Sequence, residues 1–201
     1  DAYLDGVRLL ELRTNPLIHR RAGLTTRQTI HATRKGLTRF QAAHPDFRCG
    51  IVVIAMRSHG GNMARILLRE IIGEKEEYHD NVGVVGFDIA GPESPFPPIL
   101  FRSAYELAGR MGLMKTAHAG ESEGPERIWE AIDNLGPHRI GHGTSAGRDP
   151  ELLKRLAKDG VVVECCLTSN IHTGATDRYA DHPLPKSLEA ERKLALCTDT
   201  P

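Results

Sequence analysis

Residues 115–122, with the sequence KTAHAGES, place a histidine and a glutamate close together at the end of a short apolar run. Only Ala119 and Gly120 separate His118 from Glu121. These side chains are unfavourable in a hydrophobic core, because burying an ionisable group without a partner costs free energy. An imidazole can bind a metal ion and a carboxyl group can move a proton, so the segment is a candidate for metal-assisted acid–base chemistry.

Other polar residues follow the same pattern, because each lies where an apolar run ends. They are Asp88, His142, Ser169, Asn170 and Asp199. Each one alone has an ordinary interpretation, such as a cap for Asp88 or Asp199, or a tight turn for His142 between two glycines. In parallel α/β proteins, however, the carboxyl ends of the strands converge on the face where ligands bind. Their shared position therefore favours a site.

The combination of His118, Glu121 and Asp199 offers imidazole and carboxylate groups without a thiolate. Such a set suits a catalytic zinc or iron ion that keeps an open position for water. The metal would lower the pKa of that water toward neutrality. The other eight histidines are interpreted as surface or structural residues: His19, His31, His44, His59, His79, His138, His172 and His182.

Seven β-rich runs are the predicted strands that would position these side chains. Most of them are almost continuously apolar, which indicates strands that are covered on both faces, as in parallel sheets. They span residues 7–13, 50–56, 82–90, 113–119, 138–143, 161–167 and 193–199.

Amphipathic stretches between these runs are predicted helices, over residues 25–44, 62–72, 97–112, 124–136 and 149–160. Thr25 and Gln28 form a capping-box pattern, and Asp149 and Gly160 mark the start and the end of the fifth helix. The proline-rich residues 91–98 are predicted to form a rigid loop. The alternation of strand and helix predicts either an open doubly wound sheet or most of a (βα)8 barrel. The first strands lack a GxGxxG or Walker A sequence, which weakens the nucleotide-fold alternative.

The composition is that of an ordinary globular domain, with 201 residues, 40% hydrophobic residues and a formal net charge of zero. Because the charges are balanced and mixed, we expect no electrostatic binding to nucleic acid or to an anionic membrane. A signal peptide and a membrane-spanning run are not apparent, so we expect a cytoplasmic protein. Cys49, Cys165, Cys166 and Cys197 form no CxxC pair and are predicted to be buried free thiols.

Six short motifs occur in an order that resembles the adenosine deaminase family of metal-dependent, amidohydrolase-type (βα)8 barrels. They are VGFDIAGPE, TAHAGE, RIGHGT, CLTSN, HPLP and CTDTP. The early LLELRTNP also resembles the second-strand motif of that family. The resemblance covers the whole chain and implies a TIM-type barrel present here as strands 2–8. Residues 1–201 are accordingly expected to be one catalytic domain that lacks the first βα unit and the C-terminal helices.

The resemblance implies a role for each matching residue. His118 and Asp199 would be zinc ligands, and Asp199 would also take a proton from the attacking water. Glu121, kept protonated by burial, would protonate the purine ring at N1, and His142 would orient the zinc-bound hydroxide. Asp88 and Gly91 are assigned to substrate binding, with the backbone N–H of Gly91 contacting the purine.

Two departures from the family pattern are apparent. The family supplies two further zinc ligands from a His-x-His pair on its first strand, and this pair does not occur in the sequence. These two ligands are therefore expected upstream. The second departure is Thr200, which stands where the family usually has an aspartate that binds purine N7. A threonine hydroxyl can donate to N7, but its side chain is shorter.

The sequence thus predicts a zinc-dependent hydrolytic deaminase of a 6-aminopurine nucleoside, a small-molecule substrate for which adenosine is the first choice. Deamination of adenine or of aminodeoxyfutalosine remains an alternative, as does a catalytically inactive purine-binding barrel. Hydrolysis of a cyclic amide ranks lower, because the predicted strand ends lack the bridging lysine that such enzymes often carry. The oligomeric state stays open.

Overall fold

The computed structural model describes residues 2–75, 82–189, 193–197 and 199. Its centre is a seven-stranded sheet in which every paired strand is parallel to its neighbour. The spatial order follows the chain from β1 to β7. The strands are β1 Leu9–Thr14, β2 Arg48–Met56, β3 Val84–Ala90, β4 Met114–Ala119, β5 Arg139–His142, β6 Val162–Cys165 and β7 Leu194–Leu196.

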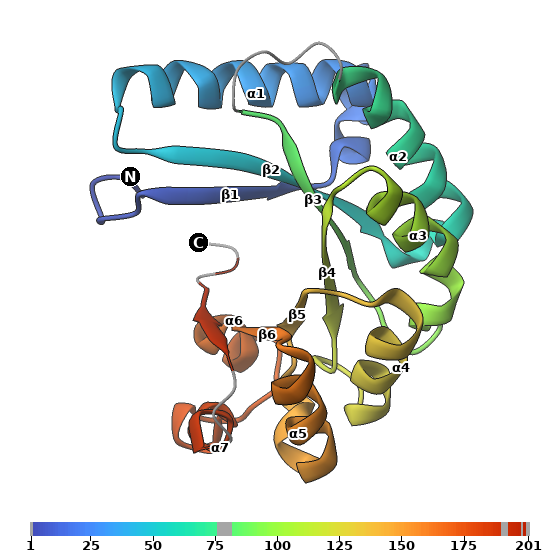
Figure 1. Ribbon diagram of the computed structural model, residues 1–201, viewed down its shortest axis with the longest axis vertical. Coiled ribbons are helices and arrows are strands. Elements are labelled where there is room, and N and C mark those ends of the chain that lie inside the picture. The colour runs from blue at the N-terminus through green and yellow to red at the C-terminus, as the bar shows by residue number, and fades with distance from the viewer. Residues whose placement is uncertain (1, 76–81, 190–192, 198, 200–201) are drawn as a thin grey trace.

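The sheet curls into a partial barrel, and the helices cover its outer face (Figure 1). The α-helices are α1 Thr26–Ala43, α2 Gly60–Lys75, α3 Arg102–Arg110, α4 Pro125–Leu135, α5 Pro150–Asp159, α6 Leu167–His172 and α7 Leu184–Glu189. Short 3₁₀ turns are η1 Pro16–Ala22, η2 Arg57–His59, η3 Pro98–Phe101, η4 Thr144–Arg148 and η5 Tyr179–Asp181. This architecture confirms the prediction of successive βα units in a barrel-type sheet.

All seven predicted strands are present, with differences mainly at their ends. The predicted strand over residues 161–167 ends at Cys165, and the short helix α6 follows it. The predicted helix over residues 97–112 begins as the 3₁₀ turn η3 before α3 starts at Arg102. The reason is local, because Pro98 disfavours the helical conformation at the residue before it, and Pro97 is extended with φ −64° and ψ 155°.

Helix capping follows the predicted chemistry. The Thr25 side chain accepts a hydrogen bond from the backbone of Gln28, whose side chain in turn accepts one from the Thr25 backbone. Asp149 accepts hydrogen bonds from two backbone N–H groups at the start of α5 and a third, at 2.8 Å, from the Trp129 indole. The bonds from backbone N–H groups satisfy donors that a helix start leaves without partners.

The hydrophobic core lies between the sheet and its covering helices. Phe87 on β3 and Tyr105 on α3 are buried, and their rings meet edge to face with centroids 5.3 Å apart. The Tyr105 hydroxyl donates to the carbonyl of Thr116 on β4. This contact satisfies the one polar group that Tyr105 carries into the core.

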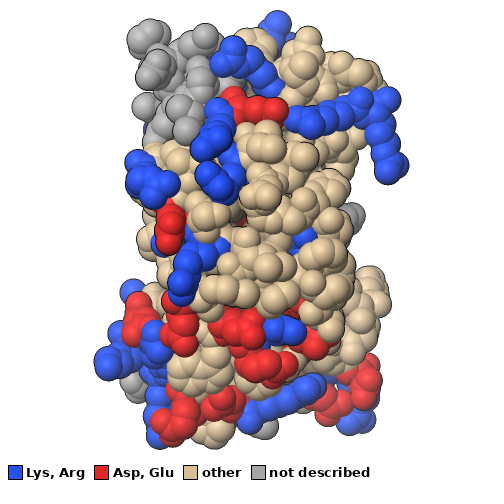
Figure 2. Space-filling view, turned by 90° about the vertical axis from the view of Figure 1, so that its right-hand side faces the viewer, with Lys and Arg blue, Asp and Glu red and all other residues tan. Residues whose placement is uncertain are grey.

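Charged residues of both signs lie on the outer helical face (Figure 2). Lys and Arg predominate in the upper half of this view, whereas acidic and basic side chains are mixed in the lower half. Arg155 on α5, for example, pairs with Asp133 at 3.1 Å and also contacts Asp159. Exposed pairs of this kind contribute at most about 1 kcal/mol each.

Cys49, Cys165 and Cys166 are buried free thiols as predicted, whereas Cys197 is partly exposed. Among the described residues, none of the helices combines the length and the apolar character needed to cross a membrane.

We expect Phe87→Ala to lower the free energy of unfolding by about 3–5 kcal/mol, because it leaves a cavity in a fully buried part of the core. Phe40→Ala is the matched control, since Phe40 on α1 is 38% exposed and should cost less. Urea denaturation of both variants measures the difference. Equal losses would contradict this description of the core.

Candidate active site

Three of the predicted side chains lie around a fourth, His142, which is the last residue of β5. The His118 ring, on β4, has its centroid 4.9 Å from that of His142. Glu121 Oε2 lies 3.5 Å from His142 Nε2. Asp199 follows β7, and one of its carboxylate oxygens lies within 4.8 Å of a His142 ring nitrogen. The carboxyl ends of β4, β5 and β7 therefore bring together residues that are far apart in sequence.

Backbone strain marks the same place. Among the described residues, His142 (φ 62°) and Asp199 (φ 63°) alone are non-glycine residues with positive φ. This conformation costs about 1–2 kcal/mol for an L-residue and persists only where the surroundings enforce it. Such strain clusters at functional sites, and here it coincides with two residues that were selected from sequence for their chemistry.

A buried carboxylate orients His118. Asp88 on β3 is fully buried, and its Oδ2 lies 2.9 Å from His118 Nδ1 and 3.2 Å from a guanidinium nitrogen of Arg13. Burial opposes the charge on Asp88, but His118 and Arg13 outweigh it and hold the pKa of Asp88 below its usual range. Burial likewise disfavours the His118 cation, and Asp88 outweighs it and raises the pKa of His118.

This position differs from the substrate-binding role that the sequence assigned to Asp88. The carboxylate has no exposed surface, and it faces His118 and Arg13. A carboxylate next to Nδ1 favours a hydrogen on that nitrogen, which leaves the Nε2 lone pair available to a metal.

Arg13 on β1 belongs to a series of ion pairs that joins β1, β3, β5 and β6 across the inside of the curved sheet. Its guanidinium contacts Asp88 and also Glu164 on β6. Glu164 accepts a second contact, at 3.3 Å, from Arg139 on β5, which also pairs with Glu11 on β1. Alternating signs make the burial of these groups tolerable, because each charge faces at least one opposite charge.

A second buried carboxylate holds the loop that carries Glu121. Glu93, 3% exposed, accepts backbone N–H bonds from Gly120 at 2.8 Å, Glu121 at 2.9 Å and Ser122 at 3.0 Å. Gly120 has φ 67°, and a Cβ there would come within 2.5 Å of Ile128. The turn thus requires glycine, and Glu93 fixes the backbone from which the Glu121 side chain projects.

Arg57 connects the same loop region to β4. It is fully buried after β2, and its guanidinium donates to the carbonyl of Phe96 at 2.5 Å and to that of His118 at 2.7 Å. Both bonds are charge-assisted and join the loop after β3 to the carboxyl end of β4.

Behind His142 lie two further buried polar side chains. Asn170 on α6 has its amide nitrogen 3.0 Å from His142 Nδ1, and its amide oxygen lies 3.1 Å from His182 Nε2. Burial and the neighbouring His118 lower the pKa of His142, so the neutral ring is favoured.

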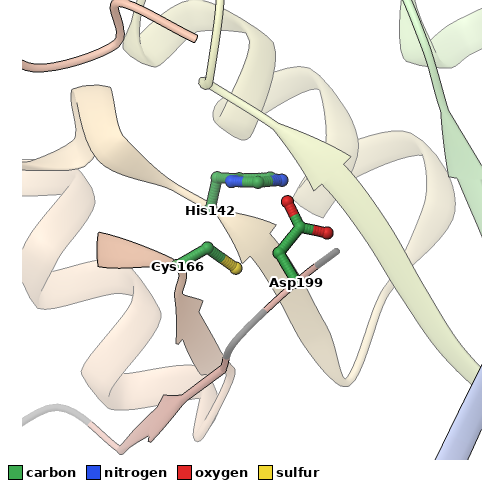
Figure 3. Close-up of side chains that lie close together, drawn as sticks. All are labelled: His142, Cys166 and Asp199. Atoms are coloured by element: carbon green, nitrogen blue, oxygen red, sulfur yellow. The ribbon is translucent and has the colours of Figure 1, made fainter. Parts of the chain in front are cut away.

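The structure places the thiol of Cys166 beside His142 and Asp199, whereas the sequence predicted a set of imidazole and carboxylate groups without a thiolate. The Cys166 sulfur, one His142 nitrogen and one Asp199 oxygen all lie within 4.8 Å of one another, and the three side chains point toward one another in Figure 3. A hydrogen bond with Cys197, together with burial, raises the pKa of Cys166 well above its ordinary value, which favours the neutral thiol.

The other predicted site residues have different outcomes. Gly91 directly follows β3, has φ 100° and is exposed, and its backbone contact with the purine stays a prediction. The prediction for Thr200 lies outside the described residues. Sequence reasoning gave no site role to Arg13, Arg57, Glu93 or His182. Arg13, Glu93 and His182 do fall within the motifs LLELRTNP, GPE and HPLP, and this was the signal available in the sequence.

The donor set fits a metal ion at the carboxyl ends of the strands. Asp88 favours a hydrogen on His118 Nδ1, which leaves the lone pair of Nε2 free to bind a metal ion. Asp199 and His142 lie close to each other at the same place. Imidazole and carboxylate donors suit zinc, whereas the raised pKa of Cys166 favours a neutral thiol, which is a poor zinc ligand.

A curved sheet of parallel strands, with histidine and carboxylate groups gathered at its carboxyl edge, defines a (βα)-barrel protein with a candidate metal site. The adenosine deaminase family model matches residues 1–201. An adenosine deaminase of Clostridium kluyveri is 33% identical over 99% of this chain. The chain belongs to the adenosine deaminase family.

Solved structures agree with this assignment. Adenine deaminase from Arthrobacter aurescens superposes with a TM-score of 0.88 and 26% identity over 98% of this chain and 58% of that chain. An amidohydrolase from Burkholderia ambifaria, solved with bound zinc, gives a TM-score of 0.82 and 27% identity over 96% of this chain and 53% of that chain. The present chain spans 56% of the length of the Clostridium relative.

We expect Glu93→Gln to loosen the loop that carries Glu121, because an amide offers one acceptor oxygen where the carboxylate offers two. The N–H groups of Gly120, Glu121 and Ser122 should exchange hydrogen faster, with a stability loss of about 1–3 kcal/mol. Glu126→Gln is the matched control, since Glu126 is exposed and accepts one N–H bond, from Gly124. Unchanged exchange at residues 120–122 would contradict the role given to Glu93.

Proposed function

We propose that this chain contributes the carboxyl-end site of a zinc-dependent hydrolytic deaminase, which converts a 6-aminopurine nucleoside to its 6-oxo product and ammonia. The observation that carries the proposal is the convergence of His118, Glu121 and Asp199 on His142. His142 and Asp199 have a positive φ. A buried carboxylate contacts each of the other two, because Asp88 lies beside the His118 ring and Glu93 accepts the backbone N–H of Glu121. Family membership supports the same chemistry.

His118, through Nε2, and Asp199 are the residues of this chain that would hold the metal. When bound, zinc supplies a water molecule whose pKa is near neutrality. Two further histidine ligands, from a strand upstream of this sequence, belong to the proposal because the family pattern contains them. Four-coordinate catalytic zinc commonly has three protein ligands and water, and a fifth ligand is used in some sites.

The chemical difficulty lies in the substrate, because the amino-bearing carbon C6 is a poor electrophile until the adjacent ring nitrogen N1 is protonated. Glu121 would donate that proton as the water oxygen adds to C6, and Asp199 would take a proton from the water. The C6–N bond then breaks. One water hydrogen leaves with the amino group as ammonia, and the other restores the Glu121 carboxyl group.

Glu121 keeps part of its side chain exposed on the side that a purine ring would cover. Its side chain is 24% exposed, so it is less buried than the sequence analysis expected. A purine ring that covers this surface would remove the remaining water.

Adenosine is the first substrate to test, since the curated relative is an adenosine deaminase with 33% identity. Adenine is the second candidate, because the structural neighbour with a TM-score of 0.88 is an adenine deaminase. Comparison of kcat/KM for adenosine, adenine and aminodeoxyfutalosine discriminates among them. A protein that binds purines and turns over none of the three would instead be the inactive barrel.

Glu121→Gln should lower kcat by about 10²–10⁴-fold, because an amide cannot donate the proton that activates C6. Binding of the 6-oxo product, measured by calorimetry, should change only a few-fold. Glu123→Gln, two residues further along the same loop, is the control and should keep kcat. A Glu121→Gln enzyme within tenfold of the parent would show that the acid has been assigned wrongly.

His118→Ala should reduce the zinc content of the purified protein well below that of the parent, because it removes a ligand whose orientation Asp88 fixes. His59→Ala is the matched control, since this histidine is exposed and lies in η2 beyond the carboxyl end of β2. Metal analysis by plasma mass spectrometry gives the measurement. Equal zinc in both variants and the parent would contradict the metal assignment.

A further inference from the structure

His142, Asn170 and His182 are buried and joined by hydrogen bonds, and this series ends at a backbone N–H group. Asn170 is fully buried, and His182 and His142 are 4% and 3% exposed. The backbone N–H of Leu184, at the start of α7, donates to His182 Nδ1 at 3.1 Å. Pro183 has no N–H, so Leu184 supplies the first backbone donor after His182.

That backbone donor determines the direction of each following hydrogen bond. A peptide N–H can only donate, so His182 Nδ1 must accept, and the neutral ring carries its hydrogen on Nε2. His182 Nε2 therefore donates to the amide oxygen of Asn170. The amide nitrogen of Asn170 is then left facing His142 Nδ1 at 3.0 Å.

An amide nitrogen also can only donate, so His142 Nδ1 must be the acceptor. The reverse orientation of the Asn170 amide would place two donors against each other at His182. In the neutral His142 ring the hydrogen consequently lies on Nε2, the nitrogen that is 3.5 Å from Glu121 Oε2.

We propose that Asn170 and His182 are positioning residues that hold His142 in the tautomer with its hydrogen on Nε2, aimed at the reaction site. The mechanistic part rests on the proposed deaminase function. In this tautomer His142 offers the attacking oxygen a hydrogen-bond donor and has no lone pair with which to remove its proton. Proton removal is thereby left to Asp199.

The strained backbone of His142 is consistent with this requirement. Its φ of 62° directs the ring from the end of β5 to the place where Asn170 of α6 can reach Nδ1. With Nδ1 held by Asn170, ring rotation would break a buried hydrogen bond and leave the Asn170 N–H without a partner. A buried donor left unsatisfied costs about 1–3 kcal/mol.

The direct test is the ¹⁵N chemical shift of the two His142 ring nitrogens in the labelled protein, assigned by comparison with His142→Gln. The expected spectrum shows hydrogen on Nε2 and a lone pair on Nδ1. Hydrogen on Nδ1 would overturn the inference. This measurement does not depend on activity, so it separates failure of the inference from failure of the proposed function.

Asn170→Asp gives the kinetic test, because aspartate has the shape of asparagine but can only accept hydrogen bonds. The hydrogen of His142 should move to Nδ1, and kcat should fall by about 10²–10⁴-fold with KM changed only a few-fold, as expected for a catalytic histidine in the wrong tautomer. Exposed His172, also on α6, provides the control, since His172→Phe should change neither the spectrum nor kcat. An Asn170→Asp enzyme with the parental spectrum and kcat would overturn the inference.

His182 provides a second pair of variants in case Asn170→Asp does not fold. His182→Phe retains an aromatic ring but removes the donor to Asn170, and kcat should fall about tenfold or more. His182→Gln supplies an amide donor and should restore part of this loss. Equal kcat in the Phe and Gln variants, with the His142 spectrum unchanged in both, would count against a role for His182 in positioning.

Discussion

The burial of Asp88 is the constraint on which the candidate site depends. A carboxylate without solvent contact is expensive unless opposite charges surround it. Here Arg13 of β1 and His118 of β4 approach it from the two sides of β3. The same three strands thus fix the charge of Asp88 and the ring direction of His118, so the geometry of this proposed metal ligand follows from the packing of the sheet.

The proposed reactive groups share a common form of support. Each projects from the carboxyl end of a strand or from the loop beyond it, and buried polar partners come from other elements. Glu93 holds the loop of Glu121 through three backbone N–H groups, and Asn170 holds the ring of His142. Placement on rigid strands with buried support leaves little freedom at the reacting atoms, which is what precise proton transfer requires.

Stability and activity make opposite demands at the strand ends. The positive φ values of His142 and Asp199 and the partly buried charges around Arg13 all cost free energy locally. The large apolar core between the sheet and the outer helices offsets these costs. Most residues of β2, β3, β5 and β6 are buried, so the site is held by contacts far from the chemistry.

Much of the architecture is determined by local sequence. The apolar runs gave all seven strands, and the Thr25–Gln28 capping box and the Asp149 cap marked helix starts, because both signals depend on residues close together in the chain. The strand-end positions of His118 and His142 followed from the same runs. The 3₁₀ start of the third predicted helix and the short α6 were missed, since neither has enough residues for a clear period.

The tertiary structure alone decided which groups meet. Asp88 supports His118 where substrate contact had been expected, Cys166 lies beside Asp199, and His182 joins Asn170 although it had been classed with surface or structural histidines. These partners lie on different strands and helices. Their contacts depend on the register and curvature of the whole sheet, which no local pattern of residues specifies.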